Sequence, residues 1–386
     1  MLHAALLGDI RRSLYLQSYP AGEPPMKTPR LILACALLLF ATVMVRAQVR
    51  VHYINVGQAD AILLEFRTAA ILIDAGGETV APPNENRDRD HLIEYLTQFF
   101  ASRAAPNSPL PNLNRILLAV IISHPHVDHT KNIMAVMNTF TVQNLIDGGN
   151  DRGSGISQLN AARTFARDNN IRYAAISDNT IPRNGLIKFP ELRNSSEVDL
   201  RILAGSRGCD NQNNDSLVVL VRFRQASFLF TGDAELEGGS DCDGEIPILM
   251  DFYSTTNLLN VDVYKVGHHA SFNGTDEEFM RVMSPKISVI SAGIHTQRVP
   301  GGFHAFQFGH PRTVAVDLLE RFSSMPRQPV NVYSMPRVRR VVPRVMRRAV
   351  YCTCWDGDIR VSTSNANGSQ LRVQTSGRPD GNPPSN

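Results

Sequence analysis

The alternation of apolar and polar residues predicts that the folded part of the chain begins with paired strands. Residues 49–56 alternate as in a strand with one buried face. Two short apolar runs, 61–66 and 70–73, follow at hairpin distance, and the second runs into Asp74. Residues 115–123 form a continuous apolar run, which is typical of a strand buried on both faces. A first sheet is therefore expected from these segments.

The second half of the chain repeats this order in outline. Residues 216–222 and 227–230 again form a strand pair that runs into an aspartate, Asp233. Amphipathic segments elsewhere predict covering helices at residues 91–102, 133–139, 157–169, 276–283 and 313–322. Two halves of this kind predict an α/β protein, a four-layer α/β/β/α sandwich with two sheets at its centre.

The C-terminal end is expected to complete the domain with a hairpin. Residues 359–363 and 370–375 are its expected strands, joined through Asn367-Gly368, a dipeptide that favours tight turns. Residues 377–386 are polar and rich in Gly and Pro, and we expect them to be a disordered tail. The folded domain is therefore expected to span residues 48–376.

The segment before this domain, residues 1–47, is expected to be a leader. From Met26 a charged stretch is followed by fifteen mostly apolar residues and by a small-residue site that ends at Ala47. This order is typical of a signal peptide, so we expect the true start at Met26 and cleavage after Ala47. Fifteen apolar residues are fewer than the roughly 20 that span a bilayer. The chain is thus expected to be exported, to the periplasm or outside the cell, and an N-terminal membrane anchor is the alternative.

The formal charge is concentrated in the leader. The net charge of the chain is +3, and residues 1–47 hold five basic and two acidic side chains, so the domain that follows is formally neutral. A mean hydropathy of −0.15 excludes a protein with several membrane spans. A neutral domain is also unlike a dedicated nucleic-acid binder.

One local stretch departs from this neutrality. Six arginines and no acid lie between Arg337 and Arg348. Arg337, Arg339 and Arg340 are therefore candidates for binding a phosphate backbone, with nucleic acid or another phosphodiester as the partner. A solvated edge strand or loop is the alternative interpretation. No protein partner can be predicted from the sequence.

Four cysteines follow the leader, an even number that favours disulfides in an exported protein. Cys209 and Cys242 are the expected pair. Cys352 and Cys354 are judged too close in sequence for an unstrained disulfide, and without a second pair at zinc-finger spacing they do not indicate a metal site.

The most specific chemical feature is the string Ser123-His124-Pro125-His126-Val127-Asp128-His129, at the end of the buried apolar run. Three imidazoles and a carboxylate are costly to bury unless something pairs them, and together they suit zinc or a similar divalent ion. His124 and His126 stand at alternate positions and can bind one metal. Asp128 and His129 follow the turn and can bind another.

This His-x-His-x-Asp-His string resembles the signature of the metallo-beta-lactamase fold superfamily. The resemblance implies that Asp74 orients the ligand cluster, that Asp233 is the bridging carboxylate, and that the late ligand histidine is His268, which we choose over His269. His310, in Gly-His-Pro, is a candidate for binding substrate phosphate or transferring a proton, and a helix-capping or surface role is the alternative.

Further motifs resemble, more narrowly, the extracytoplasmic hydrolase domain of ComEC-type competence DNA-uptake proteins. In order they are Val-Gly-Gln-Ala-Asp-Ala, Ile-Leu-Ile-Asp-Ala-Gly-Gly, the histidine string, Asn213-Asn214-Asp215-Ser216-Leu217, Leu-Phe-Thr-Gly-Asp, Lys-Val-Gly-His-His-Ala-Ser and Phe-Gly-His-Pro. The membrane channel of those proteins has no counterpart in this sequence. Ala59 and Ala270 stand where that family usually has glycine, and Lys131-Asn132 replaces a glycine pair, which affects pocket shape and not the ligands.

Residues 130–267 contain no histidine, although beta-lactamases and lactonases of this fold place a third metal-site histidine there. Asn214 or Asp215, Asp147, or water are the expected replacements. This absence fits the competence-type resemblance and disfavours antibiotic hydrolysis.

The resemblance therefore implies two divalent ions, zinc or manganese, as cofactors. His124 and His126 with Asn214 or Asp215 would hold one ion, Asp128, His129 and His268 the other, with Asp233 between. Such a pair can hold a bridging hydroxide and promote phosphodiester hydrolysis, with Asp128 and His310 as candidate catalytic residues and Ser271 near the substrate. A phosphodiesterase or nuclease is thus expected. The alternatives are hydrolysis of a phosphorylated wall component, another small ester or a lactone, or a non-catalytic secreted binding protein.

Overall fold

The computed structural model describes residues 49–78, 86–181, 198–293, 305–363 and 368–377, which belong to one compact unit. The expected leader, its cleavage site and all but the first residue of the expected tail lie outside the described residues. In the part of the chain that is described, no helix combines the length and the apolar character needed to cross a membrane.

The first sheet has eight strands in the order β18-β17-β1-β2-β3-β5-β7-β8. Neighbours from β18 to β3 pair antiparallel, and those from β3 to β8 pair parallel. The strand bounds are β1 Arg50–Tyr53, β2 Ala61–Glu65, β3 Ala70–Ala75, β5 Ala119–Ile121, β7 Asn144–Asp147, β8 Arg172–Ala175, β17 Ile359–Thr363 and β18 Leu371–Thr375. The predicted early strands and the closing pair are confirmed. The expected long strand at 115–123 is divided between β4 (Ile116–Leu117), which pairs with β6 (Thr141–Val142), and β5.

The second sheet has six strands in the order β16-β13-β12-β11-β10-β9 and repeats the same design. Strands β9, β10 and β11 form an antiparallel meander, and β11, β12, β13 and β16 are parallel. Their bounds are β9 Val198–Ala204, β10 Val218–Phe223, β11 Ala226–Phe230, β12 Val263–Lys265, β13 Ile287–Ile290 and β16 Val350–Cys352. The expected repetition of paired strands is therefore present.

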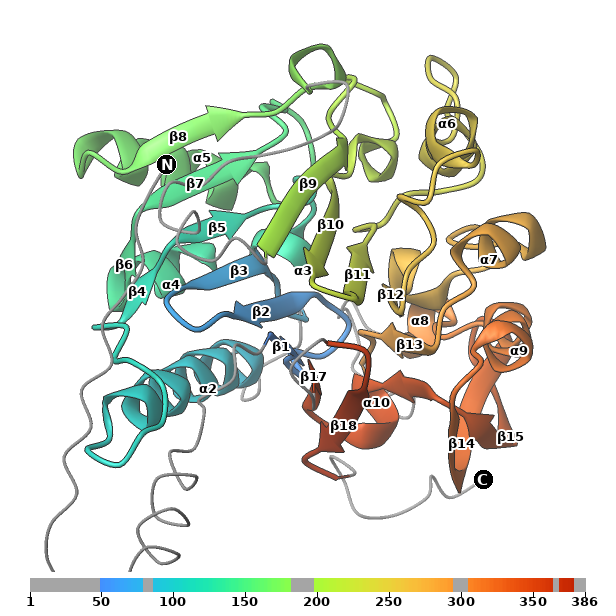
Figure 1. Ribbon diagram of the computed structural model, residues 1–386. Coiled ribbons are helices and arrows are strands. Elements are labelled where there is room, and N and C mark those ends of the chain that lie inside the picture. Colours follow the sequence, from blue (N-terminus) through green and yellow to red (C-terminus); the bar gives the residue numbers. More distant parts are fainter. Residues whose placement is uncertain (1–48, 79–85, 182–197, 294–304, 364–367, 378–386) are drawn as a thin grey trace, which may run out of the picture. The chain divides into compact units, whose positions relative to one another are not determined.

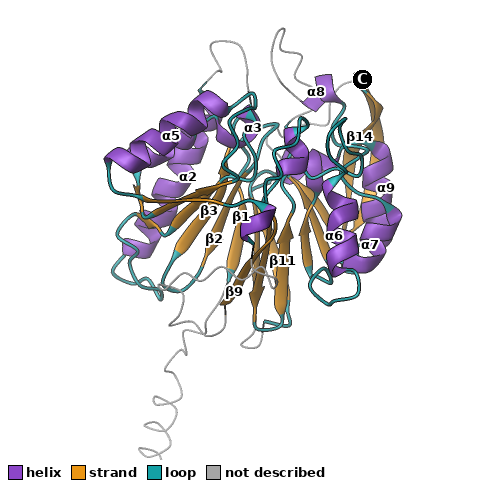
Figure 2. Cartoon of the chain, turned by 90° about the horizontal axis from the view of Figure 1, so that it is seen from above, coloured by secondary structure: helices purple, strands orange, loops and turns teal. Residues whose placement is uncertain are grey.

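Helices cover the outer face of each sheet, as Figures 1 and 2 show. The first sheet carries α2 (Arg87–Ala104), α4 (Ile133–Thr139) and α5 (Ile156–Asp168), and the second carries α6 (Glu245–Tyr253), α7 (Glu277–Met283) and α9 (Thr313–Phe322). Short helices complete the connections: α3 Val127–Thr130, α8 Ala305–Phe308 and α10 Thr353–Asp356. The predicted four-layer α/β/β/α sandwich is thus confirmed.

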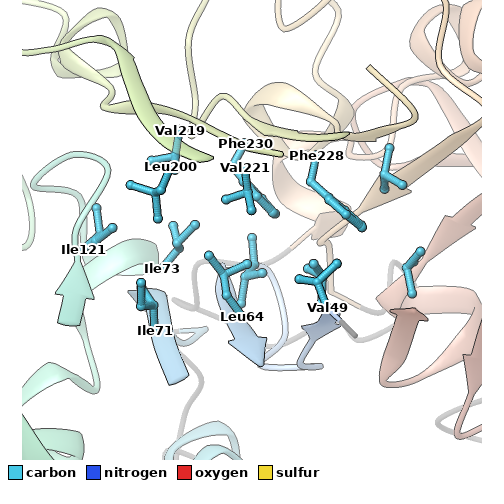
Figure 3. Packing of buried hydrophobic residues seen from close by; sticks show 14 of the residues in the cluster. Val49, Leu64, Ile71, Ile73, Ile121, Leu200, Val219, Val221, Phe228 and Phe230 are labelled. Carbon is cyan, nitrogen blue, oxygen red and sulfur yellow. The ribbon is translucent and has the colours of Figure 1, made fainter. Parts of the chain in front are cut away.

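The main hydrophobic core lies between the two sheets. Leu64 and Ile71 of the first sheet face Val221 and Phe228 of the second, and all four are at most 1% exposed (Figure 3). Alternate residues of the same strands, such as Leu63, point outward into a second cluster under the helices. Each fully buried side chain of this size contributes about 1.5–3 kcal/mol. Burial on both faces explains why the central strands are continuous apolar runs.

The arginine-rich stretch forms a separate hairpin of β14 (Pro326–Arg337) and β15 (Arg340–Arg348). Its base is held to α9, because the carboxylate of Asp317 binds Arg344 and that of Glu320 accepts from two backbone amides of β15. The hairpin lies beside α9 at the edge of the second half (Figure 1). The arginines at its tip are described below with the site.

Two disulfides join cysteines of the described ranges. Cys209 and Cys242 are joined, as expected, with their Cα atoms 5.7 Å apart. Cys352 and Cys354 are also joined, a pair that was not expected from their close spacing. The chain turns from β16 into α10 between them, which brings their Cα atoms to 5.1 Å, within the range that a disulfide spans.

Candidate metal centre

The predicted ligands meet at one edge of the sandwich, where strands of both sheets end. Asp74 is the second-to-last residue of β3, and His124 follows β5. Asp233 follows β11, and His269 follows β12. The loops approach one another closely there. A Cβ atom on Gly76 would lie 1.6 Å from the carbonyl oxygen of Asp128, so glycine is required at this position.

Four buried side chains, Asp60, His129, Asp233 and His269, present ligand atoms that all lie within 4.8 Å of one another. The Nε2 atom of His269 is 3.3 Å from a carboxylate oxygen of Asp233, and that of His129 is 3.4 Å from the same oxygen. Asp128 joins this group, since its Oδ2 lies 3.2 Å from Nε2 of His269. Carboxylate and imidazole atoms therefore converge in one buried space.

His124 and His126 form the second part of the centre. Nε2 of His124 and Nδ1 of His126 lie 3.0 Å apart. Two nitrogen ligands of one tetrahedral zinc ion, each at about 2.0–2.1 Å, are separated by roughly 3.3 Å, so the observed approach is close to that of two ligands of one ion. His124 is buried and His126 is half-buried, so His126 is the more exposed of the two.

The residues fit a metal ion in two respects. First, several buried atoms here have no hydrogen-bond partner among the described residues: Oδ1 of Asp60, Asp128 and Asp233, and Nε2 of His129. Second, the other ring nitrogen of each inner histidine is engaged: Nδ1 of His129 lies 2.8 Å from Asp74, and Nδ1 of His269 lies 2.7 Å from the carbonyl oxygen of Ser291. Metal-ligating histidines are typically oriented in this way.

The electrostatics of the cluster lead to the same conclusion. Burial by itself would lower the pKa of His129, but the carboxylates of Asp233 and Asp74 outweigh burial and raise this pKa well above its usual value. The same balance, set mainly by Asp233, raises the pKa of His269 to about 10. Burial would raise the pKa of Asp233, yet His269 and His129 hold it well below its usual range. The carboxylates thus demand positive charge, which a divalent cation can supply.

Of the two adjacent histidines, the structure places the one that was not chosen from the sequence nearest to the carboxylates. His269, and not His268, reaches Asp128 and Asp233. The Nδ1 atom of His268 lies instead 3.0 Å from the carboxylate of Glu235, and its side chain is 21% exposed. We therefore propose His269 in place of His268 as the late ligand. Ser271 follows this pair and is buried, and its backbone amide donates to the carbonyl oxygen of His268.

The expected replacements for the missing third histidine are engaged elsewhere. The Oδ1 atom of Asn214 accepts from the backbone amides of Glu235 and Glu245. Asp215 accepts from the amides of residues 207–209 and from Asn150, and Asp147 is paired with Arg163. These three side chains hold loops in place and are not brought to the histidines. The residue that does bind the ring of His126 is Gln212.

His310 lies in the site and not on the surface or in a helix cap, which corrects both alternatives. It is 6% exposed, and its ring centroid lies 5.4 Å from that of His268 and 6.3 Å from that of His269. The amide nitrogen of Gln58 lies 2.9 Å from Nδ1 of His310 and can only donate, so Nδ1 accepts and the proton is on Nε2. Burial, with the nearby His268 and His269, lowers the His310 pKa well below its usual value.

Arg337, Arg339 and Arg340 lie at the exposed tip of the β14–β15 hairpin. The tip is held beside the His310 segment, because the amide of Arg339 donates to the carbonyl oxygen of Phe306. These three arginines have no carboxylate partner among the described residues. The candidate substrate arginines are therefore near the site but do not belong to the cluster.

Three residues of the site were not singled out from the sequence: Asp60, Gln58 and Lys265. Lys265 is buried, its ammonium group binds the carboxylate of Asp60, and it also donates to the carbonyl oxygen of Gly232 at 3.2 Å. Burial would lower its pKa, but Asp60 and Asp233 raise it. All three residues stand within motifs that carried the resemblance, Val-Gly-Gln-Ala-Asp-Ala and Lys-Val-Gly-His-His, and this was the available signal.

Comparisons with known proteins agree with the resemblance. No protein-family model matches the chain. ComE operon protein 3 of Bacillus subtilis (strain 168) is 24% identical over 295 residues, which cover 74% of this chain and 32% of that protein. The chain thus spans about a third of the length of this relative.

Solved structures of similar fold include two metallo-beta-lactamase-fold proteins. YhfI from Bacillus subtilis is 13% identical, and the alignment covers 63% of this chain and 85% of YhfI with a TM-score of 0.36. Metallo-beta-lactamase SMB-1, bound to 2-mercaptoethanesulfonate, is 12% identical. The alignment covers 56% of this chain and 76% of SMB-1, with a TM-score of 0.32. Likenesses this distant carry no argument. The chain thus has the two-sheet α/β/β/α fold, and its histidine string and its relative give it a resemblance to metallo-beta-lactamase-fold proteins of the ComEC type.

Proposed function

We propose that this protein is an exported, metal-dependent hydrolase of phosphodiester bonds and that its substrate is nucleic acid. The observation that carries the proposal is the convergence of buried carboxylate and imidazole atoms that lack hydrogen-bond partners. Such groups are costly to bury unless a cation binds them. Export is supported by the apolar stretch and the small-residue site before residue 48.

The donor set divides into two groups. His124 and His126 would hold one divalent ion, and Asp128, His129 and His269 a second, with Asp233 between them. Divalent ions at these positions would supply Lewis acidity toward phosphoryl oxygens and would lower the pKa of water. Zinc or manganese suits this mixture of imidazole and carboxylate.

The protein's own residues prepare the centre for this chemistry. Asp74 accepts from Nδ1 of His129 and fixes the orientation of that ring. Lys265 binds the carboxylate of Asp60 and offsets one of the negative charges of the cluster. His310 carries its proton on Nε2, and its low pKa keeps the ring neutral, so it can donate a hydrogen bond to a phosphate oxygen.

Two features favour a phosphodiester over another ester. The chain resembles a competence-type protein, and a cluster of arginines without carboxylate partners among the described residues lies beside His310. Arginine binds phosphate through two parallel hydrogen bonds. A lactone or a neutral ester would gain little from such a surface.

The test is a substrate panel with the purified protein loaded with zinc or manganese. We expect turnover of bis(p-nitrophenyl) phosphate and of single-stranded DNA or RNA, and none of a lactone or a beta-lactam. The double variant His126→Ala/Asp128→Ala should lose the activity. Turnover of the lactone alone would assign the site to another ester, and metal binding without any turnover would assign a binding protein.

A further inference from the structure

Phe272 is an exposed aromatic ring beside the metal centre. It is 54% exposed, whereas Ser271 directly before it is 3% exposed. The loop that carries it is tight: the amide of Ser271 donates to the carbonyl oxygen of His268, and that of Gly274 donates to the carbonyl oxygen of Ser271. The ring therefore projects from a firmly held turn that begins at the two histidines of the site.

The guanidinium of Arg312 lies over this ring, 5.6 Å from its centroid. The backbone amide of Arg312 donates to the carbonyl oxygen of Ala270, which ties the two segments together. Its Nε atom is buried without a hydrogen-bond partner, and Arg312 has no carboxylate partner within the described ranges. An unpaired cation thus lies over Phe272, on the segment that also carries His310.

The hairpin tip extends the same surface. Arg312 forms an isolated bridge with Met335 of β14, and the amide of Met335 donates to the carbonyl oxygen of Pro311. At the tip itself, the backbone of Val338 lies against Gly309, since a Cβ atom on that glycine would be 3.0 Å from it. The surface near His310 therefore carries an aromatic ring, an unpaired guanidinium and the arginines of the hairpin tip.

We propose that Phe272 and Arg312 form a subsite that selects single-stranded over double-stranded nucleic acid. Phe272 stacks on an unpaired base next to the scissile phosphodiester, and Arg312 binds the adjacent phosphate. Only a single strand exposes the faces of its bases to such a ring. Stacking of this kind is worth about tenfold in affinity or more for each base. This inference rests on the proposed phosphodiester hydrolysis and adds the form of the substrate.

The test measures binding separately from cleavage. The full metal-loaded protein is titrated against a fluorescently labelled phosphorothioate single strand, which resists cleavage, and against the matching phosphorothioate duplex, and affinity is read by anisotropy. Phe272→Ala should weaken binding of the single strand about tenfold and that of the duplex less than twofold. Phe272→Tyr, which keeps a stacking ring, should bind as the wild type does. Phe252→Ala is the matched control, since Phe252 is 71% exposed and lies on α6.

Arg312 gives a second, independent measurement. Arg312→Gln should reduce the slope of log affinity against log salt for the single strand by about 0.7, the value for one phosphate contact. An unchanged slope, or a Phe272→Ala variant that binds the single strand as the wild type does, would overturn the subsite. Equal losses on single strand and duplex would also overturn it, because they would reflect a general structural effect.

Hydrolysis of bis(p-nitrophenyl) phosphate distinguishes this proposal from the proposed function. That small substrate has no neighbouring nucleotides, so its hydrolysis by the wild-type protein tests the metal centre without testing selection of the single strand. If the wild type does not hydrolyse it, the proposed function fails while the binding result still decides the subsite. If it is hydrolysed and single-strand binding is insensitive to Phe272, only the subsite fails.

Discussion

Single buried ionic residues outside the metal centre also shape the molecule, and Glu65 is the clearest. Its carboxylate accepts from Arg50 and Arg103 and lies 3.1 Å from Nε2 of His52. Burial alone would raise its pKa, but these neighbours, His52 first, lower it to about 2. Glu65 therefore stabilises the fold as long as it is ionised.

The sign of this effect predicts a pH dependence. The contribution of Glu65 is fully present above its unfolded pKa of about 4.5 and is lost as pH falls toward 2. Glu65→Gln should thus cost about 3 kcal/mol of unfolding free energy at pH 7, and this deficit should shrink below pH 4. Urea unfolding of both proteins at several pH values measures it. A deficit that does not change with pH would contradict the assignment.

Substitutions of the two adjacent histidines should have different effects on metal content. His269→Ala should lower the metal content of the purified protein, because Nε2 of His269 reaches two carboxylates of the cluster. His268→Ala is its matched control and should retain the metal, because His268 is paired with Glu235. Elemental analysis of both variants decides between them. Loss of metal in the His268 variant alone would restore the assignment expected from the sequence.

At the level of residues, the sequence indicated which side chains would lie close together, and their role as metal ligands stays a prediction. The string from His124 to His129, Asp74 and Asp233 meet as expected. Spacing along the chain did not indicate that His269, and not His268, reaches the carboxylates, because both residues have positive φ, 45° and 51°, in a left-handed turn. Such a turn changes which of two neighbouring side chains faces inward, and spacing along the chain does not reveal it.

Among the elements, the turn after β12 stores backbone strain. His268, His269 and Ala270 all have positive φ, a conformation that costs a non-glycine residue about 1–2 kcal/mol. The ligand geometry of His269 depends on this turn, which explains why strain is retained at this site.

Two alanines that replace the family's glycines provide a test of this strain. Ala270→Gly should stabilise the fold by about 1 kcal/mol, because φ at Ala270 is 60°. Ala59 has no positive φ, so Ala59→Gly should destabilise it by about 0.5–1 kcal/mol through the entropy of the unfolded chain. Chemical denaturation of both variants measures the two signs. The same sign in both would show that the backbone of residue 270 is not the cause.

The β14–β15 hairpin divides its arginines between structure and substrate. Arg344 at the base is paired with Asp317, whereas the tip arginines are exposed. The triple variant Arg337→Ala/Arg339→Ala/Arg340→Ala should reduce the salt slope of single-strand binding by about 2. Arg344→Ala, the control, should change the slope by less than half as much. A slope that survives the triple variant would remove the hairpin from the substrate surface.

The pattern of apolar residues predicted the central strands because burial on one or two faces determines their sequence. It did not predict the hairpin at Pro326–Arg348, whose strands are largely exposed and carry no clear alternation. It also missed the Cys352–Cys354 bond, because the pairing depends on the turn from β16 into α10. The hairpin and this bond depend on tertiary contacts, which is why they could not be predicted from the sequence.

For the whole molecule, the metal centre joins the two halves of the sandwich. Asp74 and the string from His124 to His129 come from the first sheet, and Asp233 and His269 come from the second. Ions bound here would therefore hold both sheets together at one edge. Removing them should destabilise the whole domain and not a single loop.

Metal content and thermal stability, measured together, test most directly whether the buried cluster is a metal centre. We predict about two divalent ions per chain, a lower melting temperature in EDTA, and recovery on adding zinc or manganese. Metal at 100 times its dissociation constant would contribute about 2.7 kcal/mol. His126→Ala/Asp128→Ala should bind less metal and lose the response to EDTA. A correctly folded wild-type protein that binds no zinc or manganese, with a melting temperature indifferent to both, would contradict the central claim.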